Sequence, residues 1–339
     1  DLPVECRLAG RGFAPADDLA VAVIRARIGR IDRRLGEPNA QFVIAGAATR
    51  VLAYLRISPA WWFTVLGLGL DPGLTQAQLH RLLDPDAAHR IASAHREIVR
   101  GIKVYAYGPA HGPSGAQAMA IGKQCAVSAG LPLVAHISHA RSALVAEDLK
   151  TLTADLLAIM TRGDVVIHWG TERAGSLLED GGPSGELMRG AIENGVRFDV
   201  AHGLHMFSFA AAKRLLAEGH APDTISTDIH KNNRHQIVFD LPTTMAKFLA
   251  LGMSLGDVVA RTTINPARVL GLDDRLGSLA IGREADITIL RRVEGEFRFE
   301  DSHGDELGGM ETLVPVAVVR AGRYIECRPS TFLAASRAD

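Results

Sequence analysis

Cysteine and lysine are scarce in this chain of 339 residues. Its three cysteines, Cys6, Cys125 and Cys327, lie too far apart for a disulfide framework or a cysteine zinc site. That scarcity favours a reducing compartment, so we expect a cytoplasmic protein. Arginine outnumbers lysine by 31 to 6, which makes each lysine position more noticeable.

Long apolar runs and a surplus of one charge are missing as well. No stretch reaches the roughly 18 apolar residues of a membrane span, and the first residues lack the order of a signal peptide. The net charge is −1 and the basic residues are scattered, which argues against nucleic-acid or membrane binding. We therefore expect a small-molecule substrate, and homo-oligomerisation stays open.

The residues that are present predict an α/β protein. Hydrophobic residues make up 47% and charged residues 22%, which is ordinary globular usage. Short β-branched runs alternate with longer helical patterns, as in parallel βα units. The predicted strands cover residues 50–57, 98–107, 131–137, 164–169, 196–202 and 224–229, with a shorter one at 42–45. The predicted helices between them cover residues 115–129, 142–160, 187–193 and 209–218.

Both ends of the chain depart from this alternation. Residues 242–251 and 255–269 predict two helices, and the Val-, Ile- and Gly-rich residues 277–292 and 312–328 predict short strands. Residues 7–34, rich in Arg and Ala, predict one amphipathic helix where a barrel should show its first strands. The predicted fold is a (β/α)8 TIM barrel with its first strand altered or absent. We expect an atypical segment over 1–40, the barrel over 41–270 and a small β domain over 271–330.

Polar residues end five of the predicted strands: Lys103, His136, His168, His202 and Asp228. Their successive spacings are 33, 32, 34 and 26 residues, about one βα unit each. Active sites of βα barrels lie at the carboxyl ends of the strands, so we expect these side chains to converge. Imidazoles and carboxylates are ligands for zinc and similar ions. Asp228 would bind the metal and also take a proton from its water.

Lys103 has two chemical interpretations. A desolvated lysine has a lowered pKa and becomes a nucleophile. It can then take up CO2 to form a carbamate that bridges two metals, or form a Schiff base with a carbonyl substrate. The nearby histidines and aspartate favour the metal, but the sequence leaves both interpretations open.

Seven segments resemble one known family. They are IVRGIKV, LPLVAHI, GDVVIHW, VRFDVAHGLHMFSFAAAKRLLAEGHAPDTISTDIH, FDLPTTMAKFLALGMSL, TTINPARVLGL and GSLAIGREADITIL. Over residues 42–328 the chain resembles the amidohydrolase/deacetylase branch of the amidohydrolase superfamily, close to dihydroorotases.

The resemblance implies particular roles for the residues at the strand ends. It implies a divalent metal, with zinc favoured, as one or two ions bridged by N6-carboxylysine at Lys103. His136 and His168 would be metal ligands, and Asp228 a general base close to the metal. His202, in the AHG segment, would lie near the substrate, and we add His230 as a second substrate-binding candidate.

The family's first strand carries a His-x-His pair that this chain does not match. No histidine precedes His80, and Pro3 and Glu5 stand at the histidine positions of an Asp-Leu-His-x-His alignment. We therefore expect an incomplete or altered N-terminus, and one-metal, weak or absent activity all stay open.

The leading hypothesis is a metal-dependent, deacetylase-like hydrolase that cleaves an amide, cyclic amide or ester of a small molecule through metal-activated water. The alternatives are an impaired remnant of such an enzyme and a Schiff-base lyase using Lys103.

Overall fold

The computed structural model describes residues 6–8, 11–13, 49–57, 85–106, 115–138, 146–178, 185–230, 232–327 and 332–333. The chain divides into two units. The sheet unit contains Val51–Phe198, and the C-terminal unit contains Asp199–Asp339 together with Ala47–Arg50 and a hairpin from the N-terminal residues. No helix within the described ranges has the length and hydropathy to cross a membrane.

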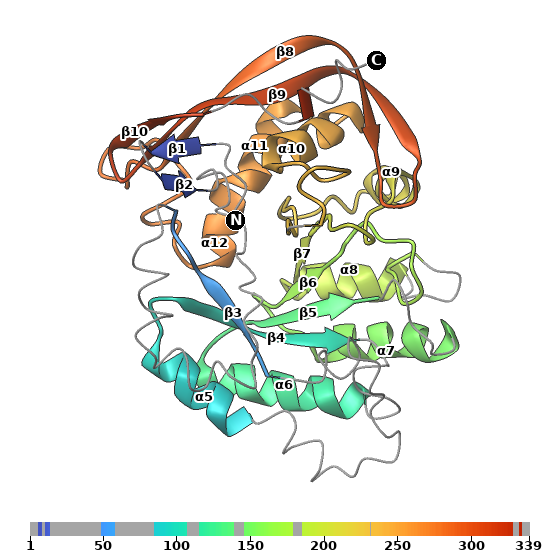
Figure 1. Cartoon of the computed structure of the whole chain (residues 1–339). Helices are drawn as coiled ribbons and strands as arrows, with labels where there is room; N and C mark the ends of the chain where they lie inside the picture. The colour runs from blue at the N-terminus through green and yellow to red at the C-terminus, as the bar shows by residue number, and fades with distance from the viewer. Residues whose placement is uncertain are drawn as a thin grey trace. The chain divides into compact units, whose positions relative to one another are not determined.

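The sheet unit is built from strands that stand side by side in chain order, β3-β4-β5-β6-β7 (Figure 1). The strands β3 to β6 pair in parallel. Their bounds are β3 (Ala53–Arg56), β4 (Val99–Ala106), β5 (Leu133–Ile137), β6 (Val165–Ile167) and β7 (Arg197–Asp199). The helices of this unit are α5 (Pro85–Ala94), α6 (Gly115–Ala129), α7 (Ala146–Ile159) and α8 (Gly185–Glu193).

Burial explains why these segments are strands. Val99, Ile102 and Val104 of β4 are each at most 2% exposed, as expected of a parallel strand covered on both faces. Helix α6 approaches β4 closely at Gly122, where a Cβ atom would lie 2.3 Å from a methyl group of Val104. The strands predicted between residues 50 and 202 each contain one observed strand, and the helix predicted over 115–129 is confirmed as α6.

The described part of the C-terminal unit carries four helices and an antiparallel sheet in the order β10-β9-β8. The helices are α9 (Phe209–Ala217), α10 (Leu241–Ala250), α11 (Leu255–Thr262) and α12 (Ile264–Val269), and the strands are β8 (Ile287–Glu300), β9 (Glu306–Arg320) and β10 (Arg323–Glu326). Side chains of Ser208, Asp240 and Ser254 accept backbone N–H groups at the starts of α9, α10 and α11. Strands β8 and β9, of 14 and 15 residues, are longer than the short strands predicted.

Three sequence predictions are corrected by the structure. The single helix over 255–269 is broken at Thr263 (φ −130°), because Pro266 lacks an N–H and its ring would clash with the carbonyl of Thr262. The strand over 224–229 is reduced to one bridge, between Asp199 and Thr224. A regular ladder is interrupted by left-handed backbone at Ala201, in the partner segment, and at Asp228.

The third correction concerns the N-terminal helix predicted over residues 7–34. An antiparallel hairpin of β1 (Cys6–Leu8) and β2 (Arg11–Phe13) stands there instead, and β1 lies against β10. Gly10 and Gly12 disfavour a helix at this point. The rest of that predicted helix, and the strand predicted over 42–45, lie outside the described residues.

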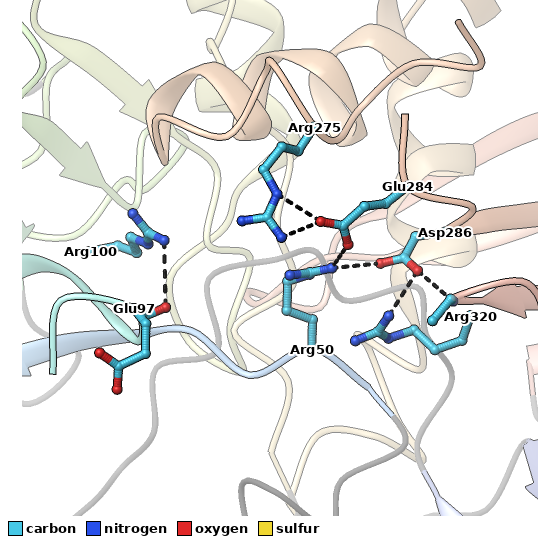
Figure 2. A network of polar contacts seen from close by, with 8 residues as sticks. Arg50, Glu97, Arg100, Arg275, Glu284, Asp286 and Arg320 are labelled. Atoms are coloured by element: carbon cyan, nitrogen blue, oxygen red, sulfur yellow. Dashed lines mark hydrogen bonds and ion pairs between the residues drawn. The ribbon is translucent and has the colours of Figure 1, made fainter. Parts of the chain in front are cut away.

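Within the C-terminal unit, an ion-pair network joins Arg50 to the residues just before β8 (Figure 2). Arg50 pairs with the carboxylate of Glu284 and lies 3.4 Å from Asp286. Arg275 also pairs with Glu284, and Arg320 lies 2.9 Å from Asp286. These side chains are partly exposed, so each pair contributes at most about 1 kcal/mol. The network chiefly orients the segment before β8.

A buried carboxylate holds the amino-terminal ends of β5 and β6 together. Asp164 is 2% exposed and accepts the N–H groups of Leu133 at 2.8 Å and Thr161 at 2.7 Å. The ammonium of Lys123, on α6, pairs with the same carboxylate. One side chain therefore joins a helix, a strand and the turn before the next strand.

We expect Asp164→Ala to lower the free energy of unfolding by about 3 kcal/mol, because the buried N–H of Leu133 and the part-buried N–H of Thr161 lose their acceptor and Lys123 loses its counter-charge. Urea denaturation followed by circular dichroism measures the change. The matched control is Asp155→Ala on the exposed face of α7, where we expect less than about 0.5 kcal/mol. Equal losses in the two variants would contradict this role of Asp164.

Candidate active site

Two of the predicted metal-binding histidines meet at the carboxyl ends of neighbouring strands. His136 lies on β5 opposite Ile167 of β6, and His168 follows Ile167 directly. Nε2 of His168 lies 2.9 Å from Nδ1 of His136, and the ring centroids are 4.1 Å apart. His168 is 1% exposed and His136 is half-buried. The structure therefore brings together two imidazoles that could share one cation.

Lys103 lies on the adjacent strand and is 4% exposed. Its Nζ atom lies 5.4 Å from the ring centroid of Tyr105, and the same ring lies 4.8 Å from the ring of His136. On the side of β3, Arg56 donates a hydrogen bond to the Tyr105 hydroxyl at 3.2 Å. Sequence reasoning missed Tyr105 and Arg56. Tyr105 could have been found, because it stands two residues after Lys103 and thus on the same face of β4.

Left-handed backbone recurs where the strands end. Ser138, His168, Ala201 and Asp228 have φ values of 64°, 71°, 39° and 45°. This conformation costs a non-glycine residue about 1 to 2 kcal/mol and persists only where surrounding structure enforces it. Two of the four are predicted site residues, and the other two stand within two residues of His136 and His202. Such strain concentrates at functional sites, which supports a site at these ends.

Asp228 lies in the C-terminal unit beside the His202–Gly203 segment. The N–H groups of His202 and Gly203 donate to the carbonyls of Ser226 and Thr227 at 3.1 and 3.0 Å. A Cβ atom on Gly203 would lie 3.1 Å from Oδ2 of Asp228, and Gly203 has a φ of +62°. This position therefore requires glycine both for its backbone and for the space that the Asp228 carboxylate occupies.

A second buried carboxylate orients the segment that carries Asp228. Asp199 is 1% exposed and accepts hydrogen bonds from the hydroxyl of Thr224 and from that of Ser226, the latter at 2.6 Å. Ser226 Oγ in turn accepts the N–H of Ala201 at 3.2 Å. Sequence reasoning missed Asp199, because a carboxylate inside an apolar strand indicates burial but does not indicate which groups hydrogen-bond to it.

His230 and Asn233 form a turn after Asp228. Asn233, fully buried, donates from Nδ2 to the Asp228 carbonyl at 3.0 Å and accepts the His230 N–H at 2.7 Å. Asn232 N–H donates to Nδ1 of His230 at 3.2 Å, so the neutral ring carries its proton on Nε2. His202 is fully buried, and both of its ring nitrogens lie within hydrogen-bond distance of protein atoms. The substrate-binding roles of both histidines stay predictions.

The predicted site residues thus form one group in each unit. Lys103, His136 and His168 belong to the sheet unit, whereas His202, Asp228 and His230 belong to the C-terminal unit. Their convergence on one rim stays a prediction. In the described part of the chain no three His, Cys, Asp or Glu side chains are grouped closely enough to hold a metal. The donor set of the sheet unit still fits, because two adjacent imidazoles beside a buried lysine that CO2 could carboxylate are suitable ligands.

The cysteines are poor candidates for chemistry. Burial raises the pKa of the Cys125 thiol to about 11, with the negative charge of Asp86 adding to the effect. The thiolate, which is the reactive form, is therefore scarcely populated near pH 7. Cys125 and Cys327 are not in disulfides, and Cys6 lies outside the residues whose side chains are described.

Parallel βα units with imidazoles at the strand ends define a TIM-barrel type of protein, and comparison with known proteins specifies the family. The model of the amidohydrolase family matches residues 208–306. A deacetylase of Agrobacterium fabrum (strain C58) is 29% identical over 265 residues, which span 78% of this chain and 61% of the relative. A deacetylase of Enterococcus faecalis (strain V583) is 30% identical over 233 residues, spanning 68% of this chain and 60% of the relative. The chain thus covers about three-fifths of the length of these relatives.

Solved structures agree with this family. An adenine deaminase matches with a TM-score of 0.72 and 26% identity, over 88% of this chain and 75% of that one. A dihydroorotase matches with a TM-score of 0.70 and 28% identity, over 86% and 75%. The chain belongs to the amidohydrolase superfamily, as the sequence motifs predicted. Its fold is the α/β barrel of that superfamily with a separate small antiparallel sheet near the C-terminus.

Gly203 provides a test of the packing around Asp228. We expect Gly203→Ala and Gly219→Ala each to lose about 1 kcal/mol from the positive φ alone. Gly219 has a φ of +84° and nothing within 4 Å of an added Cβ, so it is a matched control. Only the Gly203 variant should lose about 1 kcal/mol more, because its methyl group meets the Asp228 carboxylate. Equal unfolding free energies in urea would show that Asp228 does not lie against Gly203.

Proposed function

We propose that this chain acts as a metal-dependent hydrolase that cleaves an amide, cyclic amide or ester of a small molecule, with Asp228 as general base. The observation that carries the proposal is the pair of imidazoles, His136 and His168, held 2.9 Å apart at the ends of neighbouring parallel strands. The deacetylase and dihydroorotase names of the relatives support chemistry at a carbon–nitrogen bond.

Each proposed ligand has a position that suits its role. His136 and His168 would hold the ion, joined by Lys103 once its amine has taken up CO2 to give a carbamate and a released proton. When bound, a divalent metal such as zinc would polarise the substrate carbonyl and lower the pKa of water. The position of Lys103 supports the carbamate, because β4 lies next to the strand that carries His136.

Asp228 would act in both proton transfers of the hydrolysis. Its carboxylate accepts a proton as water adds to the carbonyl carbon and then returns it to the leaving nitrogen or oxygen, so the products are a carboxylic acid and an amine or alcohol. The left-handed backbone at Asp228 and the missing side chain at Gly203 leave room for the carboxylate beside the strand ends. His230 would contact the substrate.

The remaining parts of the proposal concern the whole protein. We keep residues 41–270 as the barrel, residues 271–330 as the small β domain, and the cytoplasm as the location favoured by scarce cysteine. The substrate class stays at small-molecule amides and esters, because specificity in such barrels depends on loops.

We expect Asp228→Asn to lower turnover by a hundredfold or more with an unchanged fold, because an amide cannot accept the proton. An N-acetyl amino acid and an activated phenyl acetate serve as probes, with the acetate released measured over time. Asp274→Asn, at an exposed position, is the control and should keep full turnover. Full turnover in Asp228→Asn would exclude Asp228 as the base.

Metal content tests the ligand set. We expect protein purified without chelator to hold one or two divalent ions per chain by mass spectrometry, an intact mass that includes one carboxyl group on lysine, and turnover that chelator removes and zinc restores. His136→Ala should lose the metal, whereas His220→Ala should keep it. A chain free of metal and without turnover would indicate the impaired remnant instead. Borohydride trapping of a carbonyl compound on Lys103 would indicate the lyase.

A further inference from the structure

Lys247 is a buried cation that the proposed hydrolysis does not use. It lies on α10 and is 1% exposed. Its Nζ atom lies 2.9 Å from Nε2 of His202, 2.6 Å from the carbonyl oxygen of Ile237 and 2.7 Å from that of Glu300. An ammonium has three N–H donors and no acceptor, so these three partners would satisfy it fully. Such complete pairing is what allows a charge to be buried.

The partners decide where the protons lie on His202. Nδ1 of His202 is 2.9 Å from the carbonyl oxygen of Gly203, and a carbonyl can only accept, so Nδ1 carries a proton. The carbonyls of Ile237 and Glu300 likewise take two protons from Lys247. The remaining contact, from Nζ to Nε2, then contains one proton. Either an ammonium donates to a neutral imidazole or an imidazolium donates to a neutral amine, and the pair carries one positive charge in both cases.

The surroundings fit a single shared charge. Burial lowers the pKa of Lys247 to about 7, close to that of an imidazole, and the negative charges of Asp301 and Glu300 oppose the shift. Asp301 is fully buried and accepts the N–H of Phe209 at 2.8 Å. Phe207 stacks on the His202 ring at 4.5 Å between centroids. The ring of His202 is therefore held by a hydrogen bond at each nitrogen and by an aromatic face.

The His202 ring connects to Asp228 through the two peptide groups on either side of the Gly203 Cα atom. The Gly203 carbonyl accepts from His202 and, at 3.4 Å, from the hydroxyl of Ser302. The Gly203 N–H donates to Thr227 at 3.0 Å, and Oδ2 of Asp228 occupies the space where a Gly203 side chain would stand. A change at the His202 ring would thus reach the residue beside the carboxylate through two consecutive hydrogen bonds.

We propose that Lys247 is a positioning residue. Its hydrogen bonds to His202 and to two carbonyls fix the protonation and orientation of the His202 ring. Through Gly203, the held ring in turn fixes the position of Asp228. His202 would then position Asp228 without forming a hydrogen bond to the substrate through its ring. The effect on turnover rests on the proposed function, whereas the effect on His202 does not.

The first arm of the test reads the His202 ring by nuclear magnetic resonance of protein labelled with 15N in its 13 histidines. His202→Gln assigns the signal by removing it. We expect wild-type His202 to show a proton on Nδ1 that exchanges slowly with water. In Lys247→Met, which keeps the volume and removes the donors, the Nε2 resonance should shift and the Nδ1 proton should exchange at least tenfold faster. Lys213→Met, exposed on α9, is the matched control and should leave the spectrum unchanged.

The second arm measures turnover of the same probes. We expect Lys247→Met to lower kcat about tenfold with KM changed less than twofold, because Asp228 is displaced and substrate contacts are kept. A His202 spectrum that is the same in Lys247→Met and wild type would overturn the proposal, as would a wild-type ring protonated on Nε2 alone. If Lys247→Met does not fold, the wild-type spectrum still tests the proposal, because it shows which nitrogen of His202 carries the proton. If the wild type has no turnover, the proposed function fails and the first arm still tests the positioning role.

Discussion

Parallel pairing in register places Tyr105 opposite His136, and His136 opposite Ile167, the residue before His168. Because side chains alternate along a strand, a shift of one residue would turn an imidazole to the other face of the sheet. The left-handed backbone of His168 turns the chain as the strand ends. The distance between the two rings therefore depends on backbone hydrogen bonds first and on the side chains second.

A few buried charges, each paired with several partners, hold neighbouring segments together within each unit. Asp164 fixes the start of β5 and the turn before β6, and Asp199 orients the residues that lead to Asp228. Lys247 joins α10 to the His202 ring and to the end of β8. Burying such groups is costly unless every donor and acceptor is used, so the same groups that stabilise these segments also restrict them to one arrangement.

Periodicity and spacing were informative for elements whose signal is local. The βα alternation predicted β4, β5 and β6, and the strand-end positions predicted that His136 and His168 would be neighbours. Periodicity was wrong at 224–229, where apolar alternation is present but left-handed backbone at Ala201 and Asp228 interrupts the ladder. It was also wrong at Thr263, where the apolar pattern continues through a break imposed by Pro266. Pattern alone does not report where the hydrogen bonds of a segment go.

The amino-acid sequence by itself determined the class of fold and the family, and it placed His136 and His168 near the ends of their strands, because motifs and hydrophobic period are properties of neighbouring residues. Only the tertiary structure decided which buried polar groups pair. Asp199 with Ser226, and Lys247 with His202, join residues 27 and 45 positions apart along the chain. Such contacts exist only once distant segments are packed, because the free energy of burying a charge depends on the partners that surround it.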